Sequence, residues 1–578
     1  MTDWDRLASG DGLGPADRAM TRLLGIAESG DVPAFFRALK QHTETLRELL
    51  AQDPGEYAAW RASIKAACSK INLKTLDALV NPPTVGGSDN ITSTLPRLAA
   101  ERCELWHDKD GNAYGTITRD DHREHWRLDS AGFRDWLAFL AYSQSGRSAS
   151  SENLKAATNA LAGQAKFDGP EFIPCWRVGH RDGSYWLDLG NDRWRAVEIT
   201  ATGWAIRDNP PVRFLHTKAT RPLPEPVSGG DVAELWELVN VPEQERLLVL
   251  AWILECYRAD TPYALLELTG EQGSAKSTAQ RILRRFIDPN AVELRGRPKT
   301  VEDVFVAAAN SHLISYENLS SLTNDQSDAL CTICTGGGYA SRRFFTNGEE
   351  HLLEAHNPAV LNGISPVVTR PDLLDRSISV ALPVITHRRT EREVQEALNR
   401  AAPRIMGALL DLLCEALALL PTVQIPPESL PRMADFARLG EAMVRVLKYP
   451  QGHFLRLYAE HRRTSITRTI EGSPVAAALV DFAQCGRTYE GTVKGLLELL
   501  GEKRPDLERE DYWPRSPKGL GDALRRYAPA LRQLGIEVHV EQKPRRDGVH
   551  CTIGSVCSGE TAGKQVHEVH KSTDVEEI

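Results

Sequence analysis

The chain has little of what marks secreted, membrane-spanning or nucleic-acid-coating proteins. Ten cysteines in 578 residues are too few and too scattered for a disulfide framework. No apolar run is long enough to cross a bilayer, and residues 1–6 lack the basic-then-apolar form of a signal peptide. We therefore expect a cytoplasmic protein without membrane contacts.

Positive charge is not in excess either. The 69 Lys and Arg residues against 78 Asp and Glu give a net charge of −9, which argues against a generally basic coat for nucleic acid and still permits a local basic patch. The composition, 42% hydrophobic and 25% charged, is that of an ordinary globular protein. Because the length exceeds what one core can organise, we predict several domains, and we find no internal repeats.

The sequence also lacks a strong metal or redox motif. Cys331 and Cys334 are its one close cysteine pair. They fall in a predicted helix without further ligands, so we expect both thiols in the core. We interpret His122 and His125 as surface residues rather than metal ligands. Residues 1–85 hold no paired carboxylates and histidine that would build a primase-polymerase site, so we predict no primer synthesis.

Hydrophobic period and breaker clusters divide the chain into six segments. Breakers follow Asn81 and occupy 222–230, and Asp-Gly pairs at 110–111 and 182–183 predict hairpin turns. We predict a helical region at 1–85, a β-rich module at 86–225, a nucleotide-binding segment with a helical lead-in at 226–390, a helical region at 391–470, a compact module at 471–554 and a disordered tail at 555–578.

Tryptophan recurs through the second group of predicted strands, at Trp176, Trp186, Trp194 and Trp204. An aromatic strand face could stack single-stranded bases. The core of a small sheet is the commoner use of such residues, and we favour it.

The first chemical motif lies at 264–278, where an apolar run breaks into a phosphate-binding loop. Small residues let backbone N–H groups converge on phosphates, and the helix N-terminus adds positive charge. Lys276 would reach the β- and γ-phosphates, and Ser277 would hold Mg²⁺. A plain turn before a helix is disfavoured by the preceding strand and the Lys-Ser-Thr ending. The expected ATP contacts are Gly270, Glu271, Gln272, Gly273, Ser274, Ala275, Lys276, Ser277 and Thr278.

Two later strands deliver polar residues at their ends. Glu317 ends the apolar run 311–316, where nucleotide hydrolases carry the carboxylate that orients Mg²⁺. Asn318 stands where a second carboxylate usually activates water, and an amide can orient water without taking its proton. Asn362 ends the next strand and could sense the γ-phosphate. A surface glutamate at an edge strand is the alternative for Glu317.

Arginines recur downstream of these strands. Arg342 and Arg343 enter a hairpin predicted from Asn347-Gly348; they could contact a DNA backbone, and a solvated hairpin is about equally consistent. Arg376 is our first candidate for a trans-acting finger that stabilises transition-state charge, and Arg370 is the second. Either arginine could instead pair with a carboxylate of its own loop, at 372 or 375.

The module at 471–554 carries a local basic excess. Between 513 and 546 there are eight Lys or Arg residues against three acids, which opposes the sign of the whole chain. A turn, a recognition-type helix and two strands predict a winged helix. Winged helices also bind proteins, so a protein contact is the alternative. The expected DNA contacts are Arg515, Lys518, Arg525, Arg526, Arg545 and Arg546.

The ordered series of phosphate loop, acidic strand, Gly-Gly hairpin, strand ending in Asn, and Arg370-Pro-Asp-Leu-Leu-Asp-Arg376 resembles the superfamily 3 branch of AAA+ ATPases. Over about 170–554 it is similar to the phage/plasmid primase-helicase group of ATP-binding proteins. The resemblance implies a multidomain α/β fold with a P-loop AAA+ core. It also implies a ring, usually a hexamer, with ATP at subunit interfaces, DNA in the channel, and Arg342 and Arg343 on the hairpin beside it.

The leading hypothesis is an ATP-dependent DNA helicase or translocase, using ATP and Mg²⁺, for replication of a phage, plasmid or integrated element. Its partners would be single-stranded or forked DNA, further copies of itself, and a separate primase or other replication proteins. The alternative is a nucleotide-switched DNA- or partner-binding AAA+ protein with slow or no turnover, acting in origin binding or defence. Ala275 and Asn318 motivate this alternative.

Overall fold

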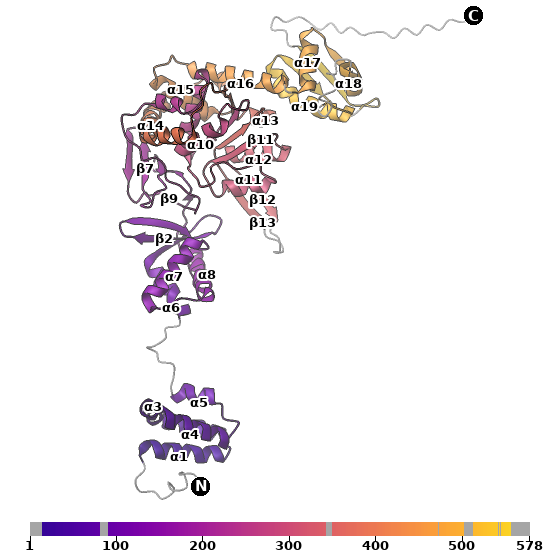
Figure 1. Ribbon diagram of the computed structural model, residues 1–578. Coiled ribbons are helices and arrows are strands. Elements are labelled where there is room, and N and C mark those ends of the chain that lie inside the picture. The colour runs from indigo at the N-terminus through magenta and orange to yellow at the C-terminus, as the bar shows by residue number, and fades with distance from the viewer. Residues whose placement is uncertain are drawn as a thin grey trace, which may run out of the picture. The chain divides into compact units, whose positions relative to one another are not determined.

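The computed structural model describes residues 14–80, 91–342, 350–471, 473–501, 513–541, 543 and 545–555, and Figure 1 shows its helices and strands. Two compact units are distinguished by their internal contacts. The first comprises residues 1–106, 113–115 and 128–170, and the second comprises 107–112, 116–127 and 171–578. The predicted tail lies outside the described residues, apart from Ser555.

The predicted N-terminal helical region is a group of short helices with its own core. Side chains of Asp31 and Asp53 accept hydrogen bonds from backbone N–H groups and start two of the helices. Trp60 is buried and donates its indole N–H to the carbonyl of Met20 at 3.1 Å. The helices are α1 (Pro15–Glu28), α2 (Val32–Gln41), α3 (Thr43–Gln52), α4 (Pro54–Ala67) and α5 (Leu73–Val80).

The next segment contains helices as well as the predicted strands. Its helices are α6 (Ile91–Arg102), α7 (Ala131–Ser145) and α8 (Ser151–Phe167), and its strands are β1 (Cys103–His107), β2 (Ala113–Arg119) and β3 (His122–Arg127) in the order β1-β2-β3. The expected turn at 110–111 joins β1 to β2, with Gly111 at φ 73°. Ser130 and Ser150 cap α7 and α8, which the β-rich prediction for 86–225 did not include.

A second antiparallel sheet follows, in the order β5-β6-β7-β8. Its strands are β5 (Val178–Arg181), β6 (Ser184–Asp188), β7 (Ala196–Thr200) and β8 (Gly203–Arg207), beside the short pair β4 (Pro174–Cys175) and β9 (Arg213–Phe214). Asp182 and Gly183 have φ of 52° and 77° and form the predicted tight turn. Trp186 and Trp194 are buried, consistent with the core interpretation for those two residues.

The centre of the second unit is a parallel four-stranded sheet in the order β11-β14-β10-β15. Both faces are buried, as parallel sheets require: Leu266 and Leu268 lie in one apolar cluster and Leu265 lies in another. The strands are β10 (Leu265–Thr269), β11 (Ile314–Leu319), β14 (Ala359–Gly363) and β15 (Ser377–Ala381). Their connections carry α10 (Lys276–Ile287), α11 (Val301–Ala308), α12 (Asn324–Thr335), the hairpin β12 (Gly337–Arg342) and β13 (Glu350–Ala355), and α13 (Pro371–Leu374).

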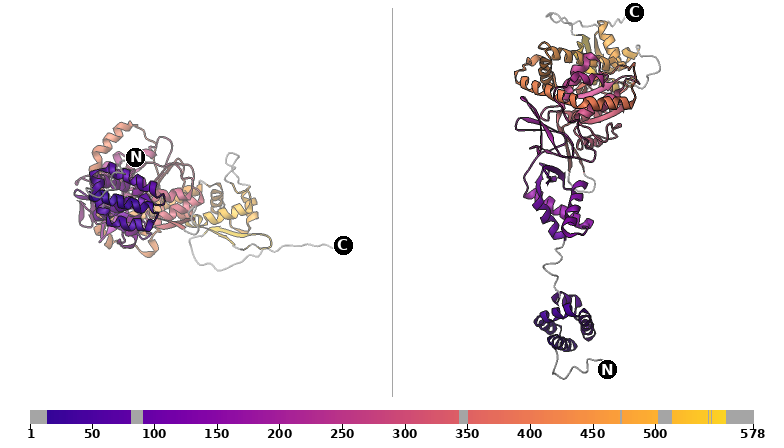
Figure 2. Two further views of the ribbon diagram at one scale, coloured as in Figure 1. Left: turned by 90° about the horizontal axis from the view of Figure 1, so that it is seen from below. Right: turned by 60° about the vertical axis from the view of Figure 1, so that its left-hand side comes forward.

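Helices flank this sheet in sequence. Before it come η2 (Val232–Glu237), η3 (Glu243–Glu245) and α9 (Arg246–Glu255), and after it come α14 (Glu391–Leu419), η4 (Leu420–Thr422), η5 (Pro427–Ser429), α15 (Ala434–Val446) and α16 (His453–Glu471). The linker at 226–230 packs closely against α14. Only glycine fits at position 407 of this helix, since a Cβ there would lie 1.9 Å from the Val227 carbonyl oxygen. Figure 2 shows α14 as a long orange helix.

The stretch Glu391–Thr422 is long and apolar enough to cross a membrane, with a mean hydropathy of 1.7 in its most apolar window. This differs from the expectation that no run is long enough. The window is 56% buried inside the protein, as in a core helix. Its buried residues include Ile405, Leu409 and Leu413, which lie in one cluster with Leu266.

The C-terminal module places three helices beside a sheet in the order β16-β18-β17. Its elements are α17 (Pro474–Gln484), β16 (Tyr489–Thr492), α18 (Val493–Gly501), α19 (Pro517–Gln533), β17 (Ile536–Val540) and β18 (His550–Ser555). Ser516 caps α19 by accepting the N–H of Gly519, and Pro517 occupies the first turn.

Candidate nucleotide site

The loop between β10 and α10 follows the path expected of a phosphate-binding loop. Gly270 and Gly273 have φ of 144° and 87°, which favour glycine. A Cβ on Gly270 would lie 2.6 Å from the Leu382 carbonyl oxygen. Helix α10 begins at Lys276, directly after the loop, so its first N–H groups are available to an anion.

Ala275 takes the left-handed backbone that glycine would adopt at this point of the motif, with φ 59° and ψ 30°. A residue with a Cβ costs roughly 1–2 kcal/mol in that conformation. The carbonyl of Ala275 still accepts the N–H of Ala279 at 2.8 Å, so the start of α10 is intact. Alanine in place of the motif's last glycine therefore strains the local backbone and leaves the start of the helix unchanged.

The Lys276 ammonium group lies on the loop itself. Its Nζ donates to the carbonyl oxygens of Gly270 at 2.7 Å and Glu271 at 2.8 Å, and reaches Ser274 Oγ at 3.3 Å. Burial lowers the pKa of Lys276 from its usual value. Phosphate oxygens would compete with these carbonyls for the ammonium group, so the loop fits an anionic phosphate chain.

Glu317 and Asn318 lie in a β-bulge at the end of β11. The register pairs Tyr316 with Leu361 and then Leu319 with Gly363, so Glu317 and Asn318 together face the single residue Asn362. Asn318 has φ 52°, a left-handed conformation that asparagine tolerates better than most residues. Bulges re-aim side chains and are common beside active sites.

Asn362 holds this bulge in place. Its Oδ1 accepts the backbone N–H of Asn318 at 2.8 Å, and its Nδ2 donates to Gln280 Oε1 at 2.6 Å. The register places Asn362 beside Leu268 of β10, two residues before the loop begins at Gly270. The structure therefore brings Asn318 and Asn362 into contact and links both to α10, while the amide of Asn362 is already hydrogen-bonded at both ends.

Gln280 is a site residue that the sequence analysis missed. It is fully buried on α10, and its Nε2 donates to Ser315 Oγ at 2.8 Å and to the Tyr316 carbonyl at 3.0 Å. The helix of the loop is thereby joined to the acidic strand. The sequence signal for Gln280 was its place four positions after Lys276, where a polar residue falls within the apolar stripe of a helix.

Glu267 is a second buried residue of this kind. Its carboxylate accepts the N–H groups of Val367 at 2.6 Å and Val368 at 2.9 Å and the hydroxyl of Ser379 at 2.6 Å. Burial raises the pKa of Glu267, and these hydrogen bonds act against that rise. The carboxylate fixes the chain just before Arg370.

The two candidate finger arginines differ in exposure. The Arg376 side chain is 12% exposed and pairs with Asp372 at 2.7 Å. The Arg370 side chain is 30% exposed and pairs with Asp328 at 2.8 Å. Both arginines are held within their own chain, as the alternative interpretation expected for residue 376, and Arg370 is the more accessible.

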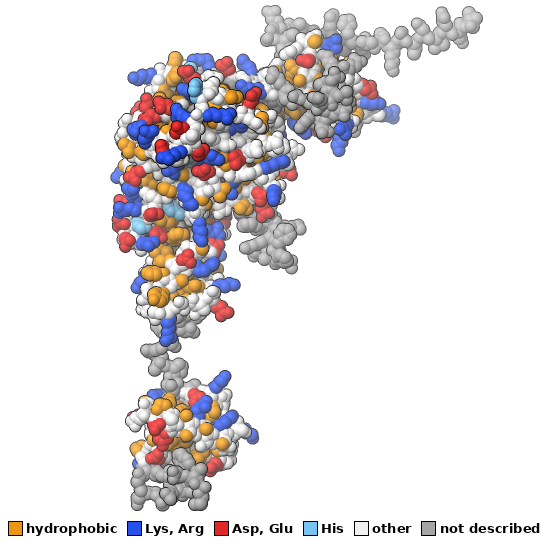
Figure 3. Space-filling view, viewed as in Figure 1, with side chains coloured by type: hydrophobic (Ala, Val, Ile, Leu, Met, Phe, Trp, Pro, Cys, Tyr) orange, Lys and Arg blue, Asp and Glu red, His pale blue; other side chains and the backbone are white. Residues whose placement is uncertain are grey.

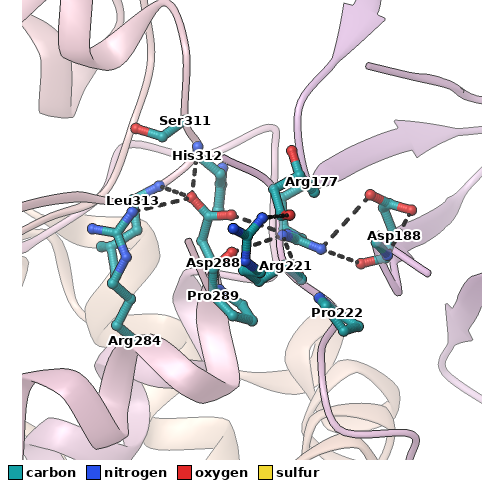
Figure 4. A network of polar contacts seen from close by, with 12 residues as sticks. Arg177, Asp188, Arg221, Pro222, Arg284, Asp288, Pro289, Ser311, His312 and Leu313 are labelled. Carbon is teal, nitrogen blue, oxygen red and sulfur yellow. Dashed lines mark hydrogen bonds and ion pairs between the residues drawn. The ribbon is translucent and has the colours of Figure 1, made fainter. Parts of the chain in front are cut away.

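A buried polar network joins the end of α10 to the start of β11 (Figure 4). Asp288 accepts the N–H groups of His312 and Leu313, both at 3.0 Å. Arg177, 1% exposed, donates from Nε to Asp288 at 3.0 Å and from Nη1 to the Asp188 carbonyl at 3.1 Å. The network thus fixes where the acidic strand begins.

Charge balance in this network sets two pKa values. Burial alone would raise the pKa of Asp288, but the Arg177 and Arg284 guanidinium groups outweigh it, so the pKa lies below its usual value. Burial lowers the pKa of His312 to about 4, despite the nearby Asp288 carboxylate. His312 is therefore neutral at pH 7, and its Nε2 lies 2.7 Å from the Cys256 carbonyl oxygen.

The prediction for the two cysteines is confirmed, whereas the prediction for the two histidines is wrong. Cys331 and Cys334 are buried, as expected, and burial raises the pKa of each to about 12. His122 and His125 are also buried, at 9% and 4% exposure, so the surface interpretation was wrong. The strands β2 and β3 place His125 against Thr116, which no local pattern indicated. Among the described residues, no group of three or more His, Cys, Asp or Glu could hold a metal ion.

Two family models match the chain. Residues 232–447 match the model described as actinomycete integrative conjugative element replication protein, AICE RepA, and residues 475–555 match the AICE RepA C-terminal domain. Together the matches span the parallel sheet, its flanking helices and the C-terminal module.

Over these two segments the chain is similar to AICE RepA replication proteins. It is a replication protein of a mobile element.

Solved structures give looser matches to the chain. One is the apo C-terminal region of NrS-1, with 14% identity and a TM-score of 0.36, covering 80% of this chain and 98% of that one. Another is titled SCCmec type IV Cch, active helicase, with 11% identity and a TM-score of 0.42, covering 78% and 92%. Likeness at this level assigns no function. No protein with a curated description matches the chain.

The segment that matches the AICE RepA C-terminal domain carries the candidate DNA contacts. All six are exposed: Arg515, Lys518, Arg525, Arg526, Arg545 and Arg546. Arg525 pairs with Asp522 at 3.3 Å and Arg545 pairs with Glu541. Lys518, Arg526 and Arg546 form no ion pair with any residue that the structure describes. In Figure 3, Lys and Arg side chains gather along the lower edge of this module.

The hairpin predicted from Asn347-Gly348 is formed by β12 and β13. These strands pair antiparallel from Gly337 opposite Ala355 to Arg342 opposite Glu350. Arg343 and the Asn-Gly tip lie outside the described residues, as does the side chain of Arg342. The paired strands are thus present from Gly337 to Arg342 and from Glu350 to Ala355.

Proposed function

We propose that this replication protein is an ATP-dependent DNA helicase or translocase acting on the integrated element. The observation that carries the proposal is the single polar linkage from the loop helix to the acidic strand. Gln280 and Asn362 hold the Glu317–Asn318 bulge to the helix that follows the loop. A nucleotide-dependent motor needs this arrangement, because the acidic group must be fixed relative to the phosphates.

The roles follow from the chain's own residues. The loop amides and Lys276 would bind the phosphates, and Ser277 with Glu317 would hold Mg²⁺. Both Ser277 and Glu317 are partly exposed, and the oxygen donors suit a hard cation. Bound Mg²⁺–ATP would supply the phosphoryl group whose hydrolysis drives movement. Asn318 and Asn362 would position water, and Arg376 or Arg370 would complete the site of a neighbouring subunit.

The strand order supports an ATPase of the AAA+ superfamily 3 type. Strand β14, which ends in Asn362, lies between β10 and the acidic strand β11. Ligands of such sheets bind outside the carboxyl ends of the strands, where the loop, Glu317 and Asn362 all lie. We propose a ring, with the β12–β13 hairpin and the C-terminal winged helix as DNA contacts.

A second candidate is a nucleotide-switched binding protein with slow turnover. Ala275 in a left-handed conformation and an amide rather than a carboxylate at position 318 favour it. Such a protein would change its assembly or DNA binding with ATP and hydrolyse little of it.

The deciding experiment compares full-length protein with Lys276→Ala, using Mg²⁺–ATP and forked DNA. The helicase proposal expects DNA-stimulated hydrolysis, assembly and strand separation, all lost in Lys276→Ala. A wild-type protein that binds ATP and assembles without unwinding would support the switch instead. Lys299→Ala, outside the loop, is the matched control.

A further inference from the structure

The connection from β15 to α14, residues 382–390, runs along the phosphate loop. The N–H of Leu382 donates to the Thr269 carbonyl at 2.8 Å, and the N–H of Ile385 donates to the Gly273 carbonyl at 3.2 Å. Asn240 Nδ2 lies 2.6 Å from the Pro383 carbonyl oxygen and 3.4 Å from that of Ser274. The connection is therefore tied to the loop at several points.

Arg388 lies at the end of this tied stretch. A Cβ built on Gly273 would stand 3.3 Å from Arg388 Nη2, so the guanidinium group lies close to the loop backbone. Arg388 is exposed. Within the part of the chain that the structure describes, its guanidinium group makes no hydrogen bond or ion pair.

The neighbouring Arg389 provides a contrast. Its Nη1 donates to the Glu237 carbonyl oxygen at 3.5 Å. The two arginines are adjacent in sequence and chemically identical, and the guanidinium group of Arg388 lies close to Gly273. The two arginine side chains therefore differ only in where they lie in the structure.

A guanidinium group beside this loop adds to positive charge that is already there. Lys276 and the start of α10 both present positive charge to the loop. Gathering like charges is unfavourable unless an anion neutralises them. Gly273 leaves room for the guanidinium group, because a side chain there would crowd Nη2.

We propose that Arg388 binds the phosphates of the nucleotide held by its own subunit, an inference that rests on the proposed ATP binding at this loop. Arginine suits the role because its planar fork pairs with phosphate oxygens. Arg388 thereby differs from Arg376 and Arg370, which are proposed to act on a neighbour's nucleotide.

The test is a titration of full-length protein with fluorescent ATP and ADP analogues in Mg²⁺. Arg388→Ala should weaken both by about tenfold, the loss of one charge-assisted contact. Arg388→Lys should keep part of the affinity, and Arg389→Ala, the matched control, should bind as wild type. Thermal midpoints should be unchanged, since the side chain is exposed.

The possible outcomes distinguish a failure of this inference from a failure of the proposed function. Wild-type affinity in Arg388→Ala overturns the inference and leaves the proposed function standing. Weakened binding in Arg388→Ala with no unwinding by the wild type supports the inference and contradicts the helicase proposal. A wild-type protein that binds neither analogue overturns both.

Discussion

The side chain of Asn362 accepts the backbone N–H of Asn318 at 2.8 Å. An amide on one strand therefore fixes the backbone of its neighbour at the point where the catalytic carboxylates of nucleotide hydrolases are expected. Because the contact is to the backbone, the side chain at 318 can change while the bulge persists.

Asn318→Asp should raise ATP turnover. The substitution adds a carboxylate that can accept a proton from water, and aspartate tolerates the left-handed backbone as asparagine does. We expect a gain of about tenfold or more in steady-state hydrolysis. Asn318→Gly is the matched control, since glycine keeps the backbone without the carboxylate. Equal rates in all three proteins would show that position 318 does not limit hydrolysis.

Ala275→Gly should stabilise the protein. Glycine relieves the left-handed strain, although its greater freedom in the unfolded chain offsets part of the gain. We expect the thermal midpoint to rise by about 1–3 °C, measured by calorimetry. Ala279→Gly, in the helix that follows, should lower it, because glycine is unfavourable inside a helix. A lower midpoint for Ala275→Gly would contradict the strain.

Arg376→Ala should lower turnover by roughly a thousandfold with ATP affinity retained, as for a finger that acts in trans. Its midpoint should also fall, because Arg376 pairs with Asp372. Mixing it with Lys276→Ala protein separates the two effects. A lost finger is restored at mixed interfaces, whereas a folding defect is not. Should Arg370→Ala rather than Arg376→Ala behave this way, the finger is Arg370.

Acid should destabilise the second unit through His312. Its pKa in the folded protein is about 4, below the value near 6.5 of an unfolded histidine. The unfolded chain therefore binds more protons between these values, so stability should rise with pH from about 4 to 6.5 and then level off. His312→Gln should flatten this rise in the thermal midpoint. An unchanged profile would mean that other groups cause it.

Replacing Lys518, Arg526 and Arg546 together by alanine should weaken DNA binding and lower its salt dependence by about three in logarithmic slope, roughly one per phosphate contact. Fluorescence anisotropy at several salt concentrations measures both. Lys494→Ala is the control, because that residue lies in the same module and faces Glu498 at 4.0 Å. An unchanged slope would favour a protein partner for this module.

Local structure was predictable from the sequence where a position demands particular backbone angles. The loop glycines, the departure at Ala275, and the Asp182-Gly183 turn each follow from the backbone angles that the position demands. The pairing of Asn318 with Asn362 was not predictable, since it depends on a bulge that brings residues 44 positions apart into contact. The sequence indicated only that each of these residues ends a strand.

The roles of buried polar residues were predicted least well from the sequence. His125 lies in β3 between the buried Glu124 and the partly buried Trp126, and this run of polar and aromatic residues does not reveal what covers it. Gln280 and Glu267 were overlooked because polar residues within apolar stretches are usually assigned to the surface. Their partners come from distant strands, so their roles emerge from packing rather than from local pattern.

Arg177 has a practical consequence for any truncated version of the protein. The proline-rich linker at 222–230 is an obvious place to start a truncated protein. The family match begins just after it, at residue 232. Such a fragment would lose Arg177, the closer of the two guanidinium partners of Asp288, and leave a buried carboxylate with only Arg284 near the start of β11. We expect soluble fragments to start ahead of residue 171, so that Arg177 and the small sheet stay with the strand that Asp288 supports.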